Sequence, residues 1–364
     1  MDFYTTNFNV SDPNVVALED CIMKKGSPAT AGSKMLANFT APFDATVVDR
    51  LQEAGIPIAG KTRMTEFGIG GFFADHLNEL SGAVQAVTSN AVSCCLCNDL
   101  FGKYRQEAAE NGLCYIHPTY GTVSRYGLIP LASSMDQIGV LCKNLSDGFS
   151  LLSNIAGHDP KDGAMFPEQS YRYERTDKDI TMCIPSSCLL NTEERAQDGI
   201  RDFVKKFTVV DEPLDDFDVY SRVMTILSCA EISNNISRYD GLKFGYRSPA
   251  AANLNEIYTK SRTEAFGLET KLAAIMGAVV LSHEYYVPVY EKAMKLRRLI
   301  KQSLHFDKYD VIALPMTNGN TVTALPSLTG LPSIAFSHHG CGIQLVANVK
   351  NENALFTAWE VSRS

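Results

Sequence analysis

Hydrophobic positions in the first hundred residues follow helical and extended patterns in turn. Residues 45–55, ATVVDRLQEAG, place apolar side chains at helical spacing and end on Gly55, so they predict a helix. The overlapping stretch 54–62, AGIPIAGKT, predicts a short buried strand after it. Residues 83–96, AVQAVTSNAVSCCL, are small and apolar almost throughout, which predicts a buried, closely packed helix.

The second half of the chain continues this mixture of strands and helices. Residues 182–190 begin like a strand, and 203–214 read as the end of a helix leading into another strand. Residues 215–302 are mostly helical in pattern. Within them, 291–304 predicts an amphipathic helix whose core face is formed by Met294, Leu296, Leu299 and Ile300, with a solvated basic face opposite.

Two further strand regions lie near the C-terminus. Residues 308–316, KYDVIALPM, predict a core strand, and 333–348 predict two strands around a turn at His338–Gly342. Strands that alternate with helices in this way predict an α/β fold with a largely buried mixed sheet. The length, 364 residues, fits either two domains or one large α/β unit.

Composition and charge exclude several function classes. With 45% hydrophobic and 20% charged residues, the chain is typical of globular proteins. Its net charge of −8 argues against direct DNA or RNA binding, although RNA contact through a partner stays open. We expect a cytoplasmic protein, because no apolar run is long enough to span a membrane and the start lacks targeting patterns.

The cysteines and histidines give no strong metal or cofactor signal. Ten irregularly spaced cysteines favour a reducing compartment, and the C-x-x-C at Cys94–Cys97 lacks a second ligand pair. His338, His339 and Cys341 lie at the expected hairpin tip. Since neighbouring side chains on a strand point to opposite faces, we predict a polar turn there and no metal site. No phosphate-binding loop motif is present, and we expect no cofactor.

One long block carries a family resemblance. HPTYGTVSRYGLIPLASSMDQIG, residues 117–139, resembles the amidase signature family, and within it the A subunits of glutamyl-tRNA(Gln) and aspartyl-tRNA(Asn) amidotransferases. Further blocks that resemble the family follow in the family's order, at residues 30–71, 234–248, 258–269 and 328–336.

The resemblance implies a fold and a domain organisation. Such proteins are single α/β units in which helices cover both faces of a mixed central sheet. We therefore expect one amidase-like domain over 1–364, with core blocks at 17–160 and 228–349. Relative to the family, the leading helices are absent, so we expect a fold truncated at its N-terminus.

The resemblance also implies a chemistry. Members use a Ser–cis-Ser–Lys triad, in which a neutral lysine takes a proton through the bridging serine from the serine nucleophile that attacks an amide. In the amidotransferases, ammonia released from glutamine travels to a partner subunit, which amidates glutamate or aspartate on mischarged tRNA.

Carried over to this sequence, the triad positions are substituted. They fall on Glu19, in LEDCI, on Glu79, in NELSGA, and on Lys103, in CNDLFGKYRQE. A two-residue shift in register would replace Glu79 by Ser81. Around Lys103 the nucleophile motif is partly kept, as a pocket remnant formed by Asp99, Gly102, Arg105 and Gln106.

These substitutions predict a pseudo-amidase with a structural or regulatory role. We expect Glu19 and Lys103 to face each other as an ion pair, B- or C-type amidotransferase subunits as partners, and tRNA contact only through them. One alternative is an active amidotransferase component or amidase that uses Ser81 or Cys97 as nucleophile. Another is a protein that binds a small molecule in the old pocket.

Overall fold

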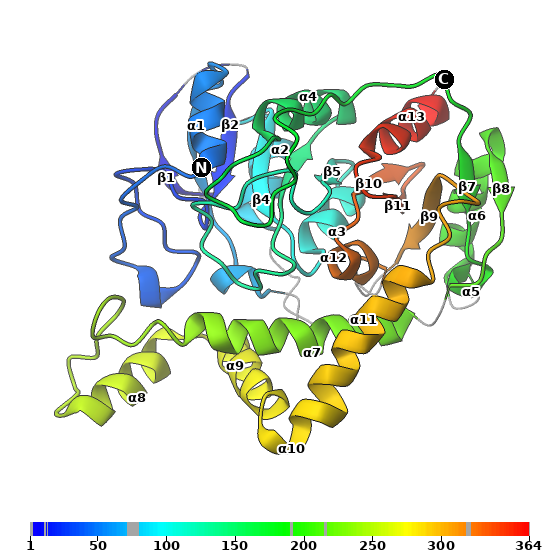
Figure 1. The fold of residues 1–364 in the computed structure, drawn as a ribbon. Coiled ribbons are helices and arrows are strands. Elements are labelled where there is room, and N and C mark those ends of the chain that lie inside the picture. The colour runs from blue at the N-terminus through cyan, green and yellow to red at the C-terminus, as the bar shows by residue number, and fades with distance from the viewer. Residues whose placement is uncertain are drawn as a thin grey trace.

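A mixed β-sheet forms the centre of the main body of the molecule (Figure 1). The structure is a computed structural model, which describes residues 3–10, 12, 14–70, 80–189, 192–214, 217–317 and 322–363. Over these residues, eleven strands pair in the order β1-β3-β2-β4-β6-β5-β10-β11-β9-β7-β8. The strands are β1 Tyr4–Asn7, β2 Val16–Glu19, β3 Ile58–Thr62, β4 Cys94–Asn98, β5 Cys114–His117, β6 Ile138–Cys142, β7 Thr181–Cys183, β8 Thr208–Val210, β9 Val311–Met316, β10 Ser333–His338 and β11 Cys341–Ala347.

Both pairing directions occur in this sheet. Strand β2 is parallel to β3 and β4, and β7 is parallel to β8 and β9, whereas the other pairs are antiparallel. The predicted strand at 54–62, the core strand at 308–316 and the hairpin at 333–348 are confirmed as β3, β9 and β10–β11.

In the chain order, the helices lie between these strands, except α13, which follows the last strand. They are α1 Thr46–Glu53, α2 Gly82–Thr88, α3 Lys103–Glu110, α4 Leu145–Ile155, α5 Ser186–Leu189, α6 Glu194–Phe203, α7 Phe217–Ile236, α8 Leu254–Ala265, α9 Leu268–Val280, α10 His283–Tyr285, α11 Lys292–Gln302, α12 Ala324–Thr329 and α13 Glu352–Arg363. Short 3-10 turns are η1 Lys34–Leu36, η2 Glu66–Gly68 and η3 Val204–Lys206, and η4 Tyr286–Glu291 is a π-helix.

The single helix predicted at 83–96 is wrong. Helix α2 ends at Thr88, and β4 begins at Cys94. Strand β4 is buried on both faces: Cys94 and Leu96 pack in one core cluster, and Cys95 and Cys97 in another. Because both faces are apolar, the sequence lacks the alternation that marks a half-buried strand.

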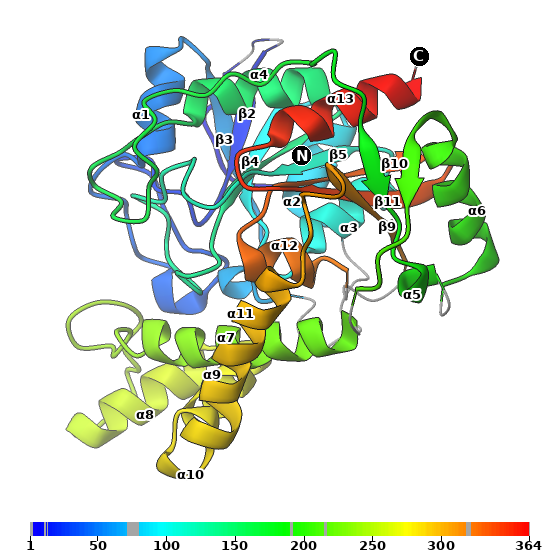
Figure 2. The ribbon, with the colours of Figure 1, turned by 45° about the vertical axis from the view of Figure 1, so that its right-hand side comes forward.

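Helices cover both faces of the central strands (Figure 2). Helices α1 and α4 contribute to the larger core cluster, and α2 and α3 to the other. Alternate residues of one strand therefore pack against different helices, as the pleat requires. The predicted α/β architecture, a mixed sheet with helices on both sides, is confirmed.

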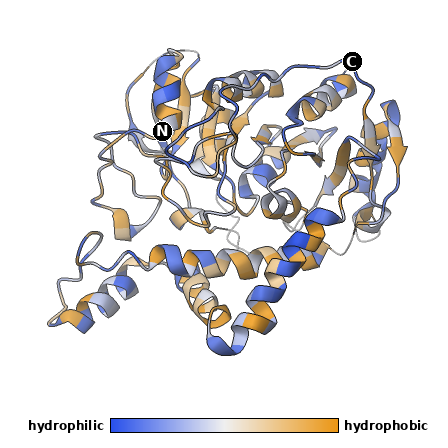
Figure 3. Cartoon of the chain, in the orientation of Figure 1, coloured by the Kyte–Doolittle hydropathy of each residue, from blue (hydrophilic) through white to orange (hydrophobic). Residues whose placement is uncertain are grey.

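Helices α8 to α11 extend from this body as a helical arm (Figures 1 and 2). The predicted core face of 291–304 is partly wrong, because Met294 and Leu299 are 44% and 58% exposed. Ile300 is buried as predicted, and Ala293, which was not predicted for the core face, is buried as well. Apolar residues are thus present on the outside of the arm (Figure 3).

None of the described helices alone is long and apolar enough to cross a membrane. One bent pair, Leu268–Val280 with His283–Gln302, meets the length and composition requirement together, at an angle of 68°.

Candidate functional site

The loop between β4 and α3 holds the residues that the sequence analysis assigned to a remnant of the nucleophile motif. Gly102 precedes the helix with a φ of 83°, and a Cβ at this position would lie 2.2 Å from Thr323 Oγ1. The Asp99 carboxylate accepts hydrogen bonds from the backbone N–H groups of Tyr104 and Arg105, both at 3.0 Å. The carboxylate thereby satisfies two of the otherwise unpaired donors at the start of α3.

Arg105 joins this loop to α12. Its side chain is fully buried and donates to Asp99 Oδ2 at 2.9 Å. Further donated bonds reach the Thr323 carbonyl at 3.0 Å and Ser327 Oγ at 2.8 Å. Of the four residues of the pocket remnant, Asp99, Gly102 and Arg105 therefore make packing contacts that fix α3 against α12.

Glu19 ends β2 inside the protein, with no exposed surface. Its carboxylate accepts three hydrogen bonds: from the Tyr104 hydroxyl at 2.5 Å, from the Asn98 backbone N–H at 2.7 Å and from the Cys21 thiol at 3.3 Å. Burial raises the pKa of Glu19 to about 7, and the three donors oppose that shift only in part.

Lys103 begins α3 and pairs with Glu107 one turn later. The distance from Lys103 Nζ to Glu107 Oε1 is 3.6 Å, and the lysine side chain is 12% exposed. Ser81 binds the same carboxylate, because its hydroxyl donates to Glu107 Oε2 at 2.5 Å and its backbone N–H at 3.2 Å. Burial raises the pKa of Glu107, and the bond from Ser81 and the charge of Lys103 counteract that shift.

The expected pairing of Glu19 with Lys103 is wrong. Neither an ion pair nor a hydrogen bond joins these two described residues, because each side chain is bound to other groups. Glu79 lies outside the described residues. The structure does bring Ser81 and Lys103 together, through Glu107, a residue that the motif pattern did not single out.

Two further contacts in this region were not predicted from the sequence. Tyr104, adjacent to Lys103, binds Glu19, and Asp20 forms a fully buried ion pair with Lys61 at 3.2 Å. The spacing of Lys103 and Glu107 is the i,i+4 spacing of helical ion pairs, so the sequence did carry a signal for that contact. No local pattern reports Tyr104–Glu19 or Asp20–Lys61, since they join distant segments.

The ten cysteines are free thiols, and Cys188 alone of them is partly exposed. Cys94 and Cys97 belong to different core clusters, so their C-x-x-C does not form a common site. Burial raises the pKa of the Cys97 thiol well above its usual value. A thiol held in its neutral form is a poor nucleophile.

A cavity of about 210 Å³ lies beside the C-terminal half of α3. Gln106, the fourth residue of the pocket remnant, borders it and donates to Glu110 Oε1 at 2.5 Å. The rest of the lining comes from α3, α6, β9 and the β10–β11 hairpin with their flanking residues, namely Ala109, Glu110, Glu193, Arg195, Ala196, Met316, Thr317, Ser337, Gly340, Cys341 and Gly342.

Comparison with known protein families identifies the family of this chain. The family model described as Amidase matches residues 15–79 and 80–330. The chain belongs to the amidase family. Strands β2 to β6 and the β4–α3 loop all fall within the matched residues.

Several members of the amidase family are similar over most of their length. The A subunit of glutamyl-tRNA(Gln) amidotransferase from Lachnoclostridium phytofermentans is 35% identical over 373 residues, which cover 90% of this chain and 75% of the relative. The corresponding protein of Thiobacillus denitrificans is 36% identical over 389 residues, covering 93% and 80%.

Solved amidase-family structures share the fold. The A subunit of glutamyl-tRNA(Gln) amidotransferase from Thermotoga maritima has a TM-score of 0.75 and 25% identity, with 98% of this chain and 85% of that chain covered. A 6-aminohexanoate cyclic dimer hydrolase has a TM-score of 0.76 at 16% identity, covering 96% and 84%, and its likeness concerns the fold alone. The predicted amidase fold is confirmed.

Proposed function

We propose that this chain keeps the amidase fold but no longer hydrolyses amides, and that it acts as a structural or regulatory component of an amidotransferase-type assembly in the cytoplasm. B- or C-type subunits would be its partners, and tRNA would be contacted only through them. The observation that carries this proposal is the bonding of Glu19, whose buried carboxylate is held by Tyr104, Asn98 and Cys21.

This bonding conflicts with the chemistry that the family resemblance implies. A triad needs a base that reaches the nucleophile, directly or through a bridging hydroxyl. Glu19 stands at the position assigned to that base, yet its contacts are a phenol, a backbone N–H and a thiol. Lys103 stands at the nucleophile position as one half of an ion pair, and an ion-paired ammonium has no free electron pair for attack.

A second candidate is a working amidase with Ser81 as nucleophile. The contact that favours it is the 2.5 Å bond from Ser81 Oγ to Glu107, because a carboxylate with a raised pKa is suited to accept a hydroxyl proton. Ser81 is buried, however, with 7% of its surface exposed. In the part of the chain that the structure describes, the Ser81 hydroxyl is bonded to Glu107, so a substrate carbonyl would first have to reach this buried group.

Activity assays on the purified full chain, with glutamine and with simple amides, separate the two candidates. The chain would be assayed alone and mixed with the products of neighbouring amidotransferase-type genes. We expect no turnover above background from protein whose folding is checked by circular dichroism. Ligand-induced thermal stabilisation without turnover would favour the small-molecule binder instead.

Turnover that Ser81→Ala and Glu107→Gln each abolish would refute the proposal and establish the second candidate. Ser89→Ala is the matched control, because Ser89 is an exposed serine just after α2. Cys97→Ala tests the remaining nucleophile, and we expect it to have no effect on any turnover found.

A further inference from the structure

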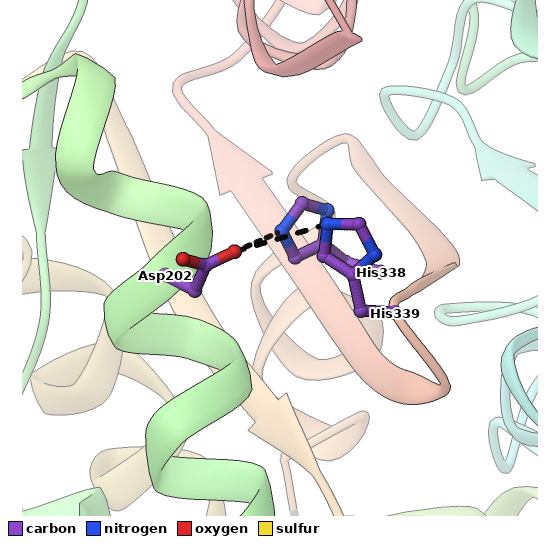
Figure 4. Close-up of side chains that lie close together, drawn as sticks. All are labelled: Asp202, His338 and His339. Carbon is purple, nitrogen blue, oxygen red and sulfur yellow. Dashed lines mark hydrogen bonds and ion pairs between the residues drawn. The ribbon is translucent and has the colours of Figure 1, made fainter.

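Three metal-ligating side chains meet where the β10–β11 hairpin packs against α6 (Figure 4). They are Asp202 of α6, His338 at the end of β10, and His339 in the turn. Asp202 Oδ2 lies 3.2 Å from His338 Nε2 and 3.8 Å from His339 Nε2. One potential ligand atom from each residue lies within 4.8 Å of the others.

The backbone explains how adjacent histidines come to face one carboxylate. Two neighbours on a strand would point to opposite faces, and the expectation of a plain polar turn rested on that geometry. In the structure β10 ends at His338, and His339 adopts a left-handed conformation with a φ of 49°. This change of direction turns the His339 ring toward the same side as the His338 ring. The premise that the two rings point to opposite faces is therefore wrong.

Close packing holds the hairpin against α6. Gly199 lies so near the hairpin that a Cβ there would be 2.5 Å from Cys341 Cβ. Asp202 follows on the same helix within one turn and therefore reaches the hairpin. The ring of Phe203 packs edge-on against His338, with centroids 5.4 Å apart, which restricts the orientation of that imidazole. Asp202 and His338 thus lie on elements that pack against each other, α6 and the β10–β11 hairpin.

We propose that Asp202, His338 and His339 bind a divalent transition-metal ion of the zinc class. Two imidazole nitrogens and one carboxylate oxygen suit Zn²⁺, which takes nitrogen, sulfur and oxygen ligands. Mg²⁺ and Ca²⁺ prefer oxygen ligands alone and do not fit this set. Water or a substrate group would complete the coordination.

The two distances from Asp202 to the histidines are close to those of a tetrahedral site. In a tetrahedron with bonds of about 2.0–2.1 Å, neighbouring ligand atoms lie about 3.3 Å apart. The contact between Asp202 and His338 already has this length. The contact of His339 with Asp202 has to shorten slightly, and its side chain, 77% exposed, is free to rotate.

Asp202 is prepared to act as the anionic ligand. Lys205 donates to its other oxygen, Oδ1, at 2.8 Å, which leaves Oδ2 directed at the histidines. A bound ion would tie α6 to the hairpin beside the cavity lined by Arg195 and Cys341.

Calorimetric titration of the metal-stripped full chain with ZnCl₂ tests the site. We expect about one Zn²⁺ per chain and no binding of MgCl₂. His339→Ala and Asp202→Asn should each weaken Zn²⁺ binding by at least about tenfold, since even partners outside the ligand shell contribute that much. The exposure of His339 makes its variant safe for folding.

His305→Ala is the matched control. His305 also contacts a carboxylate, Glu212, at 3.4 Å, and a lysine, Lys308, binds the same carboxylate, but that group has one histidine only. We expect this variant to bind Zn²⁺ like the unaltered chain. Absence of Zn²⁺ binding, or binding that His339→Ala and Asp202→Asn leave unchanged, would overturn the proposal.

Discussion

At the scale of single residues, Glu19 illustrates a competition between burial and hydrogen bonding. Three donors stabilise its ionised carboxylate, yet removal from water dominates and places its pKa at about 7. A carboxylate that is buried without a cationic partner is unusual, because burying a charge is costly unless it is paired. Glu19 is therefore half-protonated near neutral pH.

Stability should consequently depend on pH through Glu19. The folded protein binds a proton that the unfolded chain has already lost between pH 4.5 and about 7, so this contribution to stability declines as the pH rises through that range. A rise in pKa from 4.5 to about 7 corresponds to a change of about 3 kcal/mol in the free energy of unfolding. Glu19→Gln stays uncharged, and we expect its stability relative to the unaltered chain to rise by roughly that amount from pH 5 to pH 8.

Urea unfolding at several pH values measures this difference. Glu53→Gln is the control, because Glu53 is an exposed carboxylate at the end of α1. This variant controls for the loss of a carboxylate at an exposed position. Parallel pH curves for Glu19→Gln and the unaltered chain would show that the Glu19 carboxylate titrates alike in the folded and unfolded states.

At the scale of elements, the sequence predicted the helices and strands that have a regular hydrophobic pattern or that end at a recognisable turn. Helix 45–55 and the hairpin at 333–348 are of this kind, and both are present as α1 and β10–β11. Strand β4 was missed because only residues 89–93 separate it from α2, so the two elements form one run of small and apolar residues in the sequence. Of the candidate site, the Lys103–Glu107 spacing could be recognised on a helix, but Ser81–Glu107 depends on how α2 and α3 pack.

The start of α3 depends on a glycine. Gly102→Ala would combine a left-handed backbone with a Cβ 2.2 Å from Thr323 Oγ1 and 2.4 Å from Thr323 Cβ. We expect a loss of at least about 3 kcal/mol in the free energy of unfolding, from strain and overpacking together. Urea titration of the variant measures it.

Gly26→Ala separates these two contributions. Gly26 has a similar φ of 77°, but nothing lies within 4 Å of an added Cβ. Its substitution should therefore cost only the conformational part, about 1 kcal/mol. Equal losses at both positions would mean that contact with Thr323 contributes nothing.

At the scale of the whole molecule, the helical arm α8 to α11 is the most apolar exposed feature of the described chain. Leu268 and Ile275 of α9 are 69% and 62% exposed, Val287 of η4 is 60% exposed, and Leu299 of α11 is 58% exposed. Exposed apolar side chains gathered on one element mark interaction surfaces. We expect a B-type subunit of the proposed assembly to cover this arm.

Ile275→Glu tests that arrangement. A buried, unpaired carboxylate at the interface should weaken binding at least tenfold in a co-purification or calorimetric assay with the neighbouring B-type subunit. Val209→Glu is the control, because Val209 is 44% exposed on β8, at the far edge of the sheet. Undiminished binding of Ile275→Glu would place the partner elsewhere.

The strand order has a consequence for how the chain is made. Strand β5 pairs with β10. His117 of β5 therefore has no partner on that side until Ser333 of β10 has been synthesised. That partner is about 200 residues further along, which at ribosomal speed is a delay on the order of ten to forty seconds. Until β10 has been synthesised, this side of β5 is an unpaired strand edge, and such edges can pair with other chains. Yield in cells should therefore depend on elongation speed and chaperone supply more strongly than the stability of the finished protein suggests.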